Sequence, residues 1–213
     1  MAKQFDTVIK GGKVVTGEKT VEADIGIKGE KIAKIAKNIP QDGSKIIDAK
    51  GKYVLPGMID VHVHLQLPFC GTVSSDDFET GTRAAARGGV TTVIDYATQD
   101  KEKGMYAGFE RRMEEARDKV CVDYGLHGIV IQWTDQAAKE VKKMVSEGVP
   151  TYKMFMIYEK EGWQSDDAAM YAALEYTKDY GAKILVHAES ERVLNVLIGR
   201  YVNQLDKVGA YGH

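Results

Sequence analysis

The fold is decided by residues 58–98, MIDVHVHLQLPFCGTVSSDDFETGTRAAARGGVTTVIDYAT. The stretch begins and ends with an apolar run of strand length, MIDVHVHL at 58–65 and VTTVIDYAT at 90–98. Between them, residues 76–89 have the composition of a helix that ends on two glycines. A strand, a helix and a second strand in this order predict a βαβ unit with parallel strands.

The same alternation continues towards the C-terminus. The sequence predicts strands at 122–131, 151–158 and 183–189. It predicts helices at 103–119, 134–148 and 165–181, and a last helix that follows the strand 183–189 and ends at about Asp206. Thr134 is a candidate N-cap and Gly148 a candidate helix end. Five strand–helix units in series predict a parallel α/β fold, either doubly wound or a (β/α)8 TIM barrel. A TIM barrel has eight such units and about 250 residues, so we expect residues 53–213 to form an incomplete barrel.

Residues 1–52 have a different pattern, typical of β-structure. Two short strands are expected around Gly11-Gly12, and a hairpin is expected to turn at Gly29-Glu30-Lys31. A few strands cannot bury a core alone, so this part is predicted to be a segment of a small β-sandwich.

Composition narrows the class of function. The 29 Lys and Arg nearly balance the 31 Asp and Glu, which argues against a nucleic-acid or membrane-surface partner. No apolar run has the length of a transmembrane helix, and the start lacks the apolar core of a signal peptide. The two cysteines, Cys70 and Cys121, make a disulfide framework improbable, so we expect a cytoplasmic protein.

His62 and His64 are the first candidates for chemistry. They are two residues apart on a predicted strand, so their side chains share a face. Flanking residues such as Ile59 and Val61 indicate a fully buried strand. Two buried neutral histidines need a common partner, for which a metal ion is the usual choice, although an edge strand with two surface histidines is the alternative.

Lys153 lies within the apolar strand TYKMFMIY, where an unpaired ammonium is costly. It could pair with a carboxylate, act as a nucleophile with a depressed pKa, or react with carbon dioxide. The carbamate formed in the third case is an anion with two oxygens that can bridge two divalent metals. The strand alone favours the ion pair, whereas the neighbouring histidine motifs favour the carbamate.

Two further residues follow at strand ends. His187 ends the strand after that of Lys153, at the end of a barrel where active sites form. Tyr158 ends the lysine strand, where its phenol could stabilise an oxyanion or simply lie at the rim. His127, in the middle of a strand, and the terminal His213 are expected not to be ligands.

These motifs resemble those of the cyclic amidohydrolases, especially the hydantoinase and dihydropyrimidinase family. The resemblance is carried by residues 55–98 and by TYKMFMIY and KILVHAES, and it spans the whole chain. It implies a metal-bearing TIM barrel beside a small β-sandwich, with homotetramers and two divalent metals, of which zinc is the first choice. His62 and His64 would bind the buried metal, carboxylated Lys153 both metals, and His187 the exposed metal. Tyr158 would stabilise the tetrahedral intermediate.

The resemblance also implies a substrate and a reaction. Dihydroorotases have an Arg shortly after the histidine motif, whereas this chain has Leu65, Gln66, Leu67, Pro68 and Phe69. An apolar segment favours a neutral cyclic ureide, so Leu65, Phe69 and Tyr158 are predicted to contact it. The expected reaction opens a hydantoin or dihydropyrimidine ring to an N-carbamoyl amino acid.

Three alternatives stay open. The enzyme could be allantoinase-like, or the chain could be a non-catalytic dihydropyrimidinase-related scaffold, although such scaffolds are expected to lack the histidine motif or the lysine. The family also has another metal-binding His on the sixth strand of the barrel and a general-base Asp on the eighth, both later than the strands predicted in this chain. We therefore expect this chain to be a fragment that carries only the front part of the site.

Overall fold

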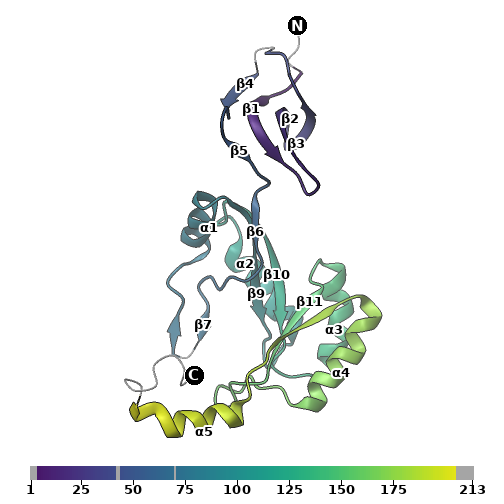
Figure 1. Cartoon of the computed structure of the whole chain (residues 1–213). Coiled ribbons are helices and arrows are strands. Elements are labelled where there is room, and N and C mark those ends of the chain that lie inside the picture. Colours follow the sequence, from purple (N-terminus) through teal and green to yellow (C-terminus); the bar gives the residue numbers. More distant parts are fainter. Residues whose placement is uncertain (1–3, 42–43, 70, 205–213) are drawn as a thin grey trace. The chain divides into compact units, whose positions relative to one another are not determined.

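A computed structural model describes residues 4–41, 44–69 and 71–204 of the 213-residue chain. Cys70, Asp206 and His213, named above, lie outside the described residues. The chain divides into two compact units, Met1–Gly57 and Met58–His213 (Figure 1). No helix of the described ranges is both long and apolar enough to cross a bilayer.

The first unit contains one β-sheet. Its strands within the described residues are β1 (Thr7–Val15), β2 (Thr20–Lys28), β3 (Lys31–Ala36), β4 (Lys45–Asp48) and β5 (Tyr53–Val54). β2 pairs antiparallel with β1 and β3, whereas β4 and β5 pair parallel with β1. Because β5 pairs with β1, this unit extends a few residues beyond the boundary expected at residue 52.

Two glycines with positive φ shape this sheet, one in a turn and one in a β-bulge. Gly29, with a φ of 59°, begins the turn between β2 and β3, which confirms the predicted hairpin. The prediction of two short strands around Gly11-Gly12 was wrong, because β1 runs through both glycines as one strand. A β-bulge absorbs them: the register with β2 shifts between Ile9 and Gly12, and Gly11 has a φ of 69°.

The second unit is an α/β unit with a parallel half-barrel sheet. Its strands are β6 (Met58–Asp60), β9 (Val90–Thr98), β10 (Asp123–Ile129), β11 (Thr151–Phe155) and β12 (Lys183–His187). They are arranged as β12-β11-β10-β9-β6, and every pair is parallel. Each strand therefore lies beside its neighbours in chain order, as in a barrel wall (Figure 1). A small hairpin of β7 (Pro68–Phe69) and β8 (Thr72–Val73) follows β6 in the chain.

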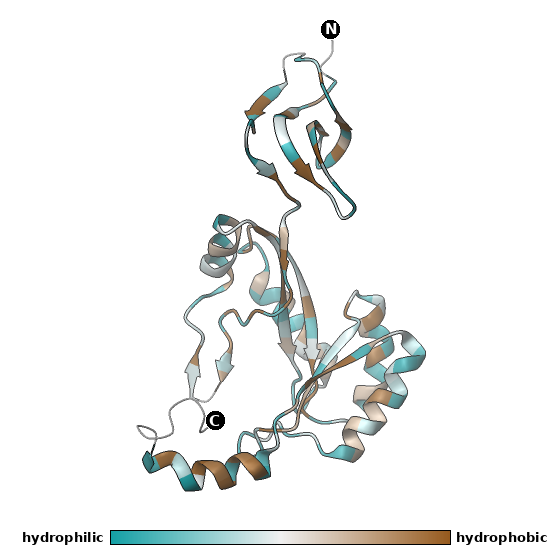
Figure 2. Cartoon of the chain, viewed as in Figure 1, coloured by the Kyte–Doolittle hydropathy of each residue, from teal (hydrophilic) through white to brown (hydrophobic). Residues whose placement is uncertain are grey.

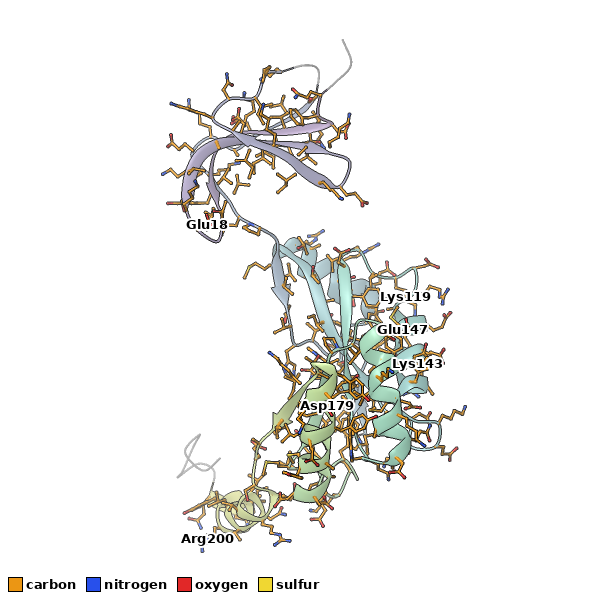
Figure 3. The ribbon with its side chains drawn as sticks, turned by 90° about the vertical axis from the view of Figure 1, so that its right-hand side faces the viewer. Glu18, Lys119, Lys143, Glu147, Asp179 and Arg200 are labelled. Carbon is orange, nitrogen blue, oxygen red and sulfur yellow. The ribbon has the colours of Figure 1, made fainter. Side chains whose placement is uncertain are left out.

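A helix follows each strand or hairpin. The helices are α1 (Phe78–Arg87), α2 (Met105–Ala116), α3 (Asp135–Ser146), α4 (Asp167–Thr177) with the 3₁₀ turn η1 (Lys178–Tyr180), and α5 (Glu191–Tyr201) with η2 (Val202–Gln204). α1 and α2 pack on β9, α4 packs on β12, and α3 contacts α2 and α4. Lys143 of α3 and the C-cap residue Glu147 are exposed on the helical side of the sheet, and the Lys143 ammonium lies 3.2 Å from the centroid of the Tyr106 ring of α2 (Figure 3). Thr134 accepts a hydrogen bond from the Ala137 N–H, which confirms it as the N-cap of α3.

Side chains alternate between the two faces of the sheet along each strand, so the core has one part on each face. One face packs against the helices and includes Leu126, Tyr152 and Met154. The opposite face carries Tyr96 and Phe155 with other aromatic residues. Hydrophobic residues also run along α5 (brown in Figure 2), where several side chains are exposed. Residues that alternate with the helix-facing core therefore form the wall on which the candidate site is built.

The first strand differs from its prediction. MIDVHVHL was expected to be one buried strand, but β6 ends at Asp60. Ile59 and Val61 are 61% and 57% exposed, because β6 lies at the edge of the sheet in the described residues. The burial argument for His62 and His64 was therefore wrong, and their case depends on their geometry.

Candidate metal and substrate site

One cavity of about 350 Å³ collects the residues that carry the predicted chemistry. Its lining includes His62, His64, Leu67, Phe69, Tyr96, Ile129, Lys153, Phe155, Tyr158, Trp163 and His187. These residues come from the segment after β6, from β9, β10, β11 and β12, and from the loop after β11. The four predicted ligands and the predicted catalytic tyrosine thus share one hollow at the carboxyl ends of the strands.

His62 and His64 converge. Their Nε2 atoms lie 3.2 Å apart, and both rings pack on the Tyr96 ring with centroids at 4.9 Å. Although both residues are exposed as a whole, partial removal of the rings from water lowers the pKa of each imidazole. The nearby Lys153 lowers the pKa of His62 and of His64 further, and each ring is therefore poised to be neutral and to offer a lone pair.

Lys153 is half-buried on β11. Its Nζ lies 5.5 Å from the centroid of the Phe155 ring, and desolvation lowers the pKa of its ammonium. Among the described residues no carboxylate forms an ion pair with it. The ion-pair alternative raised by the sequence is therefore not what the described structure contains.

His187 and Tyr158 face the same cavity from its other side. The His187 Nε2 lies 3.2 Å from the Glu189 carboxylate, and its ring packs at 5.4 Å from the Tyr158 ring. Tyr158 adopts a φ of 73°, a left-handed conformation that is unusual for a bulky residue. Its backbone N–H donates a 2.8 Å hydrogen bond to the carboxylate of Glu191 at the start of α5.

The apolar part of the cavity is mainly aromatic. The Phe69 ring lies 5.1 Å from the rings of both Tyr158 and Trp163. Leu65 does not line the cavity; it is buried against Phe78 and Ala116. Leu67, two residues later, lines the cavity instead.

Sequence reasoning missed three members of this site. Tyr96 lies beneath the two histidine rings, Trp163 forms part of the aromatic wall, and Glu191 holds the backbone of Tyr158. Tyr96 could have been predicted from the sequence. It lies two residues before the carboxyl end of β9, which was expected to lie beside the strand that leads to the histidines. Trp163 and Glu191 lie in a loop and a helix, whose position relative to Tyr158 depends on the tertiary fold.

The donor set determines whether these residues fit a metal. Within the described residues, no three His, Cys, Asp or Glu side chains gather as a metal-binding group. Two convergent imidazole nitrogens alone are too few for a protein metal site, and an unmodified lysine ammonium is no ligand. The set fits divalent metals only if Lys153 carries an oxygen-bearing group, as a carbamate would supply.

Comparison with known proteins identifies the family. The sequence profile of the amidohydrolase family matches residues 53–205. The chain belongs to the amidohydrolase family. Over its N-terminal portion, the chain resembles the hydantoinase and dihydropyrimidinase members of this amidohydrolase family.

Individual relatives give the extent of the similarity. A D-hydantoinase of Geobacillus stearothermophilus is 42% identical over 89% of this chain and 40% of its own length. A dihydropyrimidinase of Rattus norvegicus is 41% identical over 89% of this chain and 38% of its own length. The crystal structure of dihydropyrimidinase from Brevibacillus agri NCHU1002 superimposes with a TM-score of 0.88 at 39% identity, covering 93% of this chain and 43% of that one. This amidohydrolase chain therefore spans about two-fifths of the length of these relatives.

Proposed function

We propose that the protein hydrolyses the amide bond of a hydantoin or dihydropyrimidine ring and releases an N-carbamoyl amino acid. One observation carries the proposal: His62, His64, Lys153, His187 and Tyr158 line a single cavity. The relatives named D-hydantoinase and dihydropyrimidinase support the same chemistry.

His62, His64, Lys153 and His187 would hold two divalent metal ions, with zinc as the first candidate. For this role the uncharged Lys153 amine would add to carbon dioxide: the N–C bond forms as one C–O π bond becomes a carboxylate oxygen, and the nitrogen loses a proton to water. The carbamate would supply the anionic oxygen ligands that an unmodified lysine lacks. Bound metals would supply Lewis acidity and lower the pKa of a shared water molecule. The neutral imidazoles of His62 and His64 suit one such ion, and His187 suits the other.

Tyr158 is the proposed oxyanion donor. Its phenol would donate a hydrogen bond to the carbonyl oxygen of the scissile amide as negative charge develops there. Phe69, Leu67 and Trp163 would exclude water and receive an apolar ring substituent. An apolar wall favours such a ureide over the polar ureido substituent of allantoin, the alternative substrate. The proton acceptor is not assigned to any residue of this chain.

Several wider features belong to the same proposal. The half-barrel sheet would form part of an eight-stranded barrel, and the strands of the first unit would form part of a small β-sandwich. A homotetramer in the cytoplasm is the proposed state of the protein. A non-catalytic scaffold is disfavoured because all four residues proposed as ligands are present in the sequence.

Replacement of Lys153 tests the proposal. Lys153→Ala should reduce bound metal and abolish hydantoin hydrolysis, while Lys160→Ala, at an exposed position on the following loop, should change neither. Elemental analysis measures the metal, and isotopically labelled bicarbonate should give a carbamate signal that Lys153→Ala lacks. Two metals and full activity in Lys153→Ala would refute the assignment.

A further inference from the structure

The segment that carries the two histidines lies outside the regular strand, so something else must fix its backbone. β6 ends at Asp60, and beyond it the Val63 N–H still donates to the Ile94 carbonyl of β9 at 3.2 Å. The His62 N–H donates to the side chain of Asp60 at 3.1 Å. These contacts leave the two ends of the segment, Val61 and Leu65, to other groups.

A buried ion pair holds the end after His64. The Asp95 carboxylate, from β9, accepts hydrogen bonds from the Leu65 N–H at 3.2 Å and from the Tyr96 N–H at 2.6 Å. Arg112, from α2, donates to the same carboxylate at 2.7 Å and also to the Leu65 carbonyl. Both backbone polar groups of Leu65 are therefore bound by one charged pair, whose side chains are 0% and 6% exposed.

The side chain of Leu65 is fixed as well. It packs against Phe78 of α1, and the Arg112 guanidinium lies 4.5 Å from the centroid of the same Phe78 ring. A Cβ at Gly81 would lie 2.4 Å from a Leu65 methyl carbon, so glycine allows α1 to approach this side chain closely. The residue after His64 is thus immobilised through its backbone and its side chain.

His127 holds the end before His62. Its Nε2 lies 2.9 Å from the Val61 carbonyl, which can only accept, so Nε2 carries the proton. In the neutral ring Nδ1 then accepts a hydrogen bond from the Thr151 hydroxyl. Both ring nitrogens of His127 are thus occupied by protein groups, and the ring joins the Val61 carbonyl to Thr151 of β11.

The Asp95–Arg112 pair is better explained by its positioning of the Leu65 backbone than by a contribution to the stability of the fold. Burying two charges costs desolvation energy that their attraction barely offsets, and the Arg112 Nε is buried without a hydrogen-bond partner among the described residues. We propose that Asp95 and Arg112, together with His127, are positioning residues that fix the two histidines in their convergent geometry. This inference rests on the proposed function for its metal, but its geometric part concerns the backbone of residues 61–65 alone.

Two adjacent arginines of α2 provide the test and its matched control. Arg112 binds Asp95, the Leu65 carbonyl and, at 2.6 Å, the Glu115 carboxylate on its own helix. Arg111 binds Asp100 at 3.2 Å and the Thr98 carbonyl at 3.1 Å. Lysine keeps the charge at either position but cannot reproduce the guanidinium fork. Arg112→Lys should weaken zinc affinity by about tenfold or more, as loss of outer-shell partners does, whereas Arg111→Lys should leave it unchanged. Zinc affinity is measured by competition with a chelator.

Amide hydrogen exchange in the metal-free protein supplies the second readout. Exchange in residues 61–66 should be faster in Arg112→Lys than in Arg111→Lys, while exchange in β10 should be equal in both variants. Equal zinc affinity and equal exchange in the two variants would overturn the inference. If the unmodified protein binds no metal, the proposed function fails, and the exchange comparison alone then decides the positioning role.

Discussion

The backbone N–H of Tyr158 donates a 2.8 Å hydrogen bond to the Glu191 carboxylate, and this contact joins the end of β11 to the start of α5. Tyr158 needs such support because its φ of 73° is unfavourable for a residue with a large side chain. Glu191 is only 9% exposed, so its carboxylate is held in place by its surroundings. The contact holds the backbone that carries the phenol of Tyr158 into the cavity.

Replacing Glu191 should therefore impair catalysis through Tyr158. Glu191→Ala is expected to lower kcat by roughly 10- to 100-fold with little change in KM, because a displaced oxyanion donor loses contact with the transition state. Glu191→Gln keeps an acceptor oxygen and should retain most activity. Glu161→Ala, at an exposed position in the loop between Tyr158 and α4, is the control. If Glu191→Ala and Glu191→Gln lowered kcat and KM to the same extent, this role would be contradicted.

Removing the Tyr158 hydroxyl tests the donor itself. Tyr158→Phe keeps the ring contacts with Phe69 and His187 but cannot donate a hydrogen bond. We expect kcat to fall by about 10²- to 10³-fold, the usual effect of deleting one oxyanion donor, with metal content unchanged. Steady-state kinetics and elemental analysis measure the two quantities. Unchanged kcat would remove Tyr158 from the chemistry.

Asp24 should make the stability of the first unit dependent on pH. Burial raises the pKa of this carboxyl, but hydrogen bonds from Lys10 and from the Ile39 and Gly11 amides outweigh burial, so its pKa lies below the usual value of 3.8. A carboxyl with a depressed folded-state pKa stabilises the fold above the unfolded-state pKa and loses that contribution as the pH falls through the folded value.

The expected result follows from that sign. Asp24→Asn should destabilise the first unit by about 1–3 kcal/mol at neutral pH, and the difference from the unmodified protein should shrink below about pH 4. Amide hydrogen exchange of β1 and β2 in the whole chain measures it. Asp48→Asn, on the exposed strand β4, is the control. A difference that grows as the pH falls would have the wrong sign.

Thr134 caps α3, and its loss should be measurable without affecting the site. Thr134→Ala removes the acceptor for the Ala137 N–H and should lower the free energy of unfolding by about 1 kcal/mol. Thr134→Ser keeps the hydroxyl and should behave like the unmodified protein. Urea denaturation followed by tryptophan fluorescence, to which Trp133 next to the cap and Trp163 both contribute, reports the effect.

Most of the second unit could be predicted from local patterns. The alternation of apolar runs with amphipathic stretches placed the strands and helices near their observed bounds, and the cap at Thr134 marked where α3 begins. The resemblance placed His62, Lys153 and His187 in one site, and they do line one cavity. Each of these inferences depends on residues near one another in the chain or on residues at equivalent strand ends.

The failures concern contacts between distant segments. Leu65 was expected in the substrate site because it follows His64, but α1 and α2 bury it, and neither helix is visible in the pattern around it. β6 was expected to be buried because its residues are apolar, yet burial depends on which strand lies beside it. Two strands were predicted around Gly11, but the structure has one, because a β-bulge in the pairing with β2 absorbs the extra residue.

The order of the strands has a mechanical consequence. His62 and His64 follow β6, at one edge of the sheet, while His187 ends β12, at the other edge. A ligand that contacts both groups joins the two outermost strands of the described sheet, whose curvature already brings these groups to one cavity, so its affinity depends on that curvature being kept. By thermodynamic linkage, a bound ligand would in turn stiffen the sheet against flattening. A ligand bound at the site would therefore also brace the sheet, and the flexibility of the three strands between β6 and β12 contributes to the binding constant of that ligand.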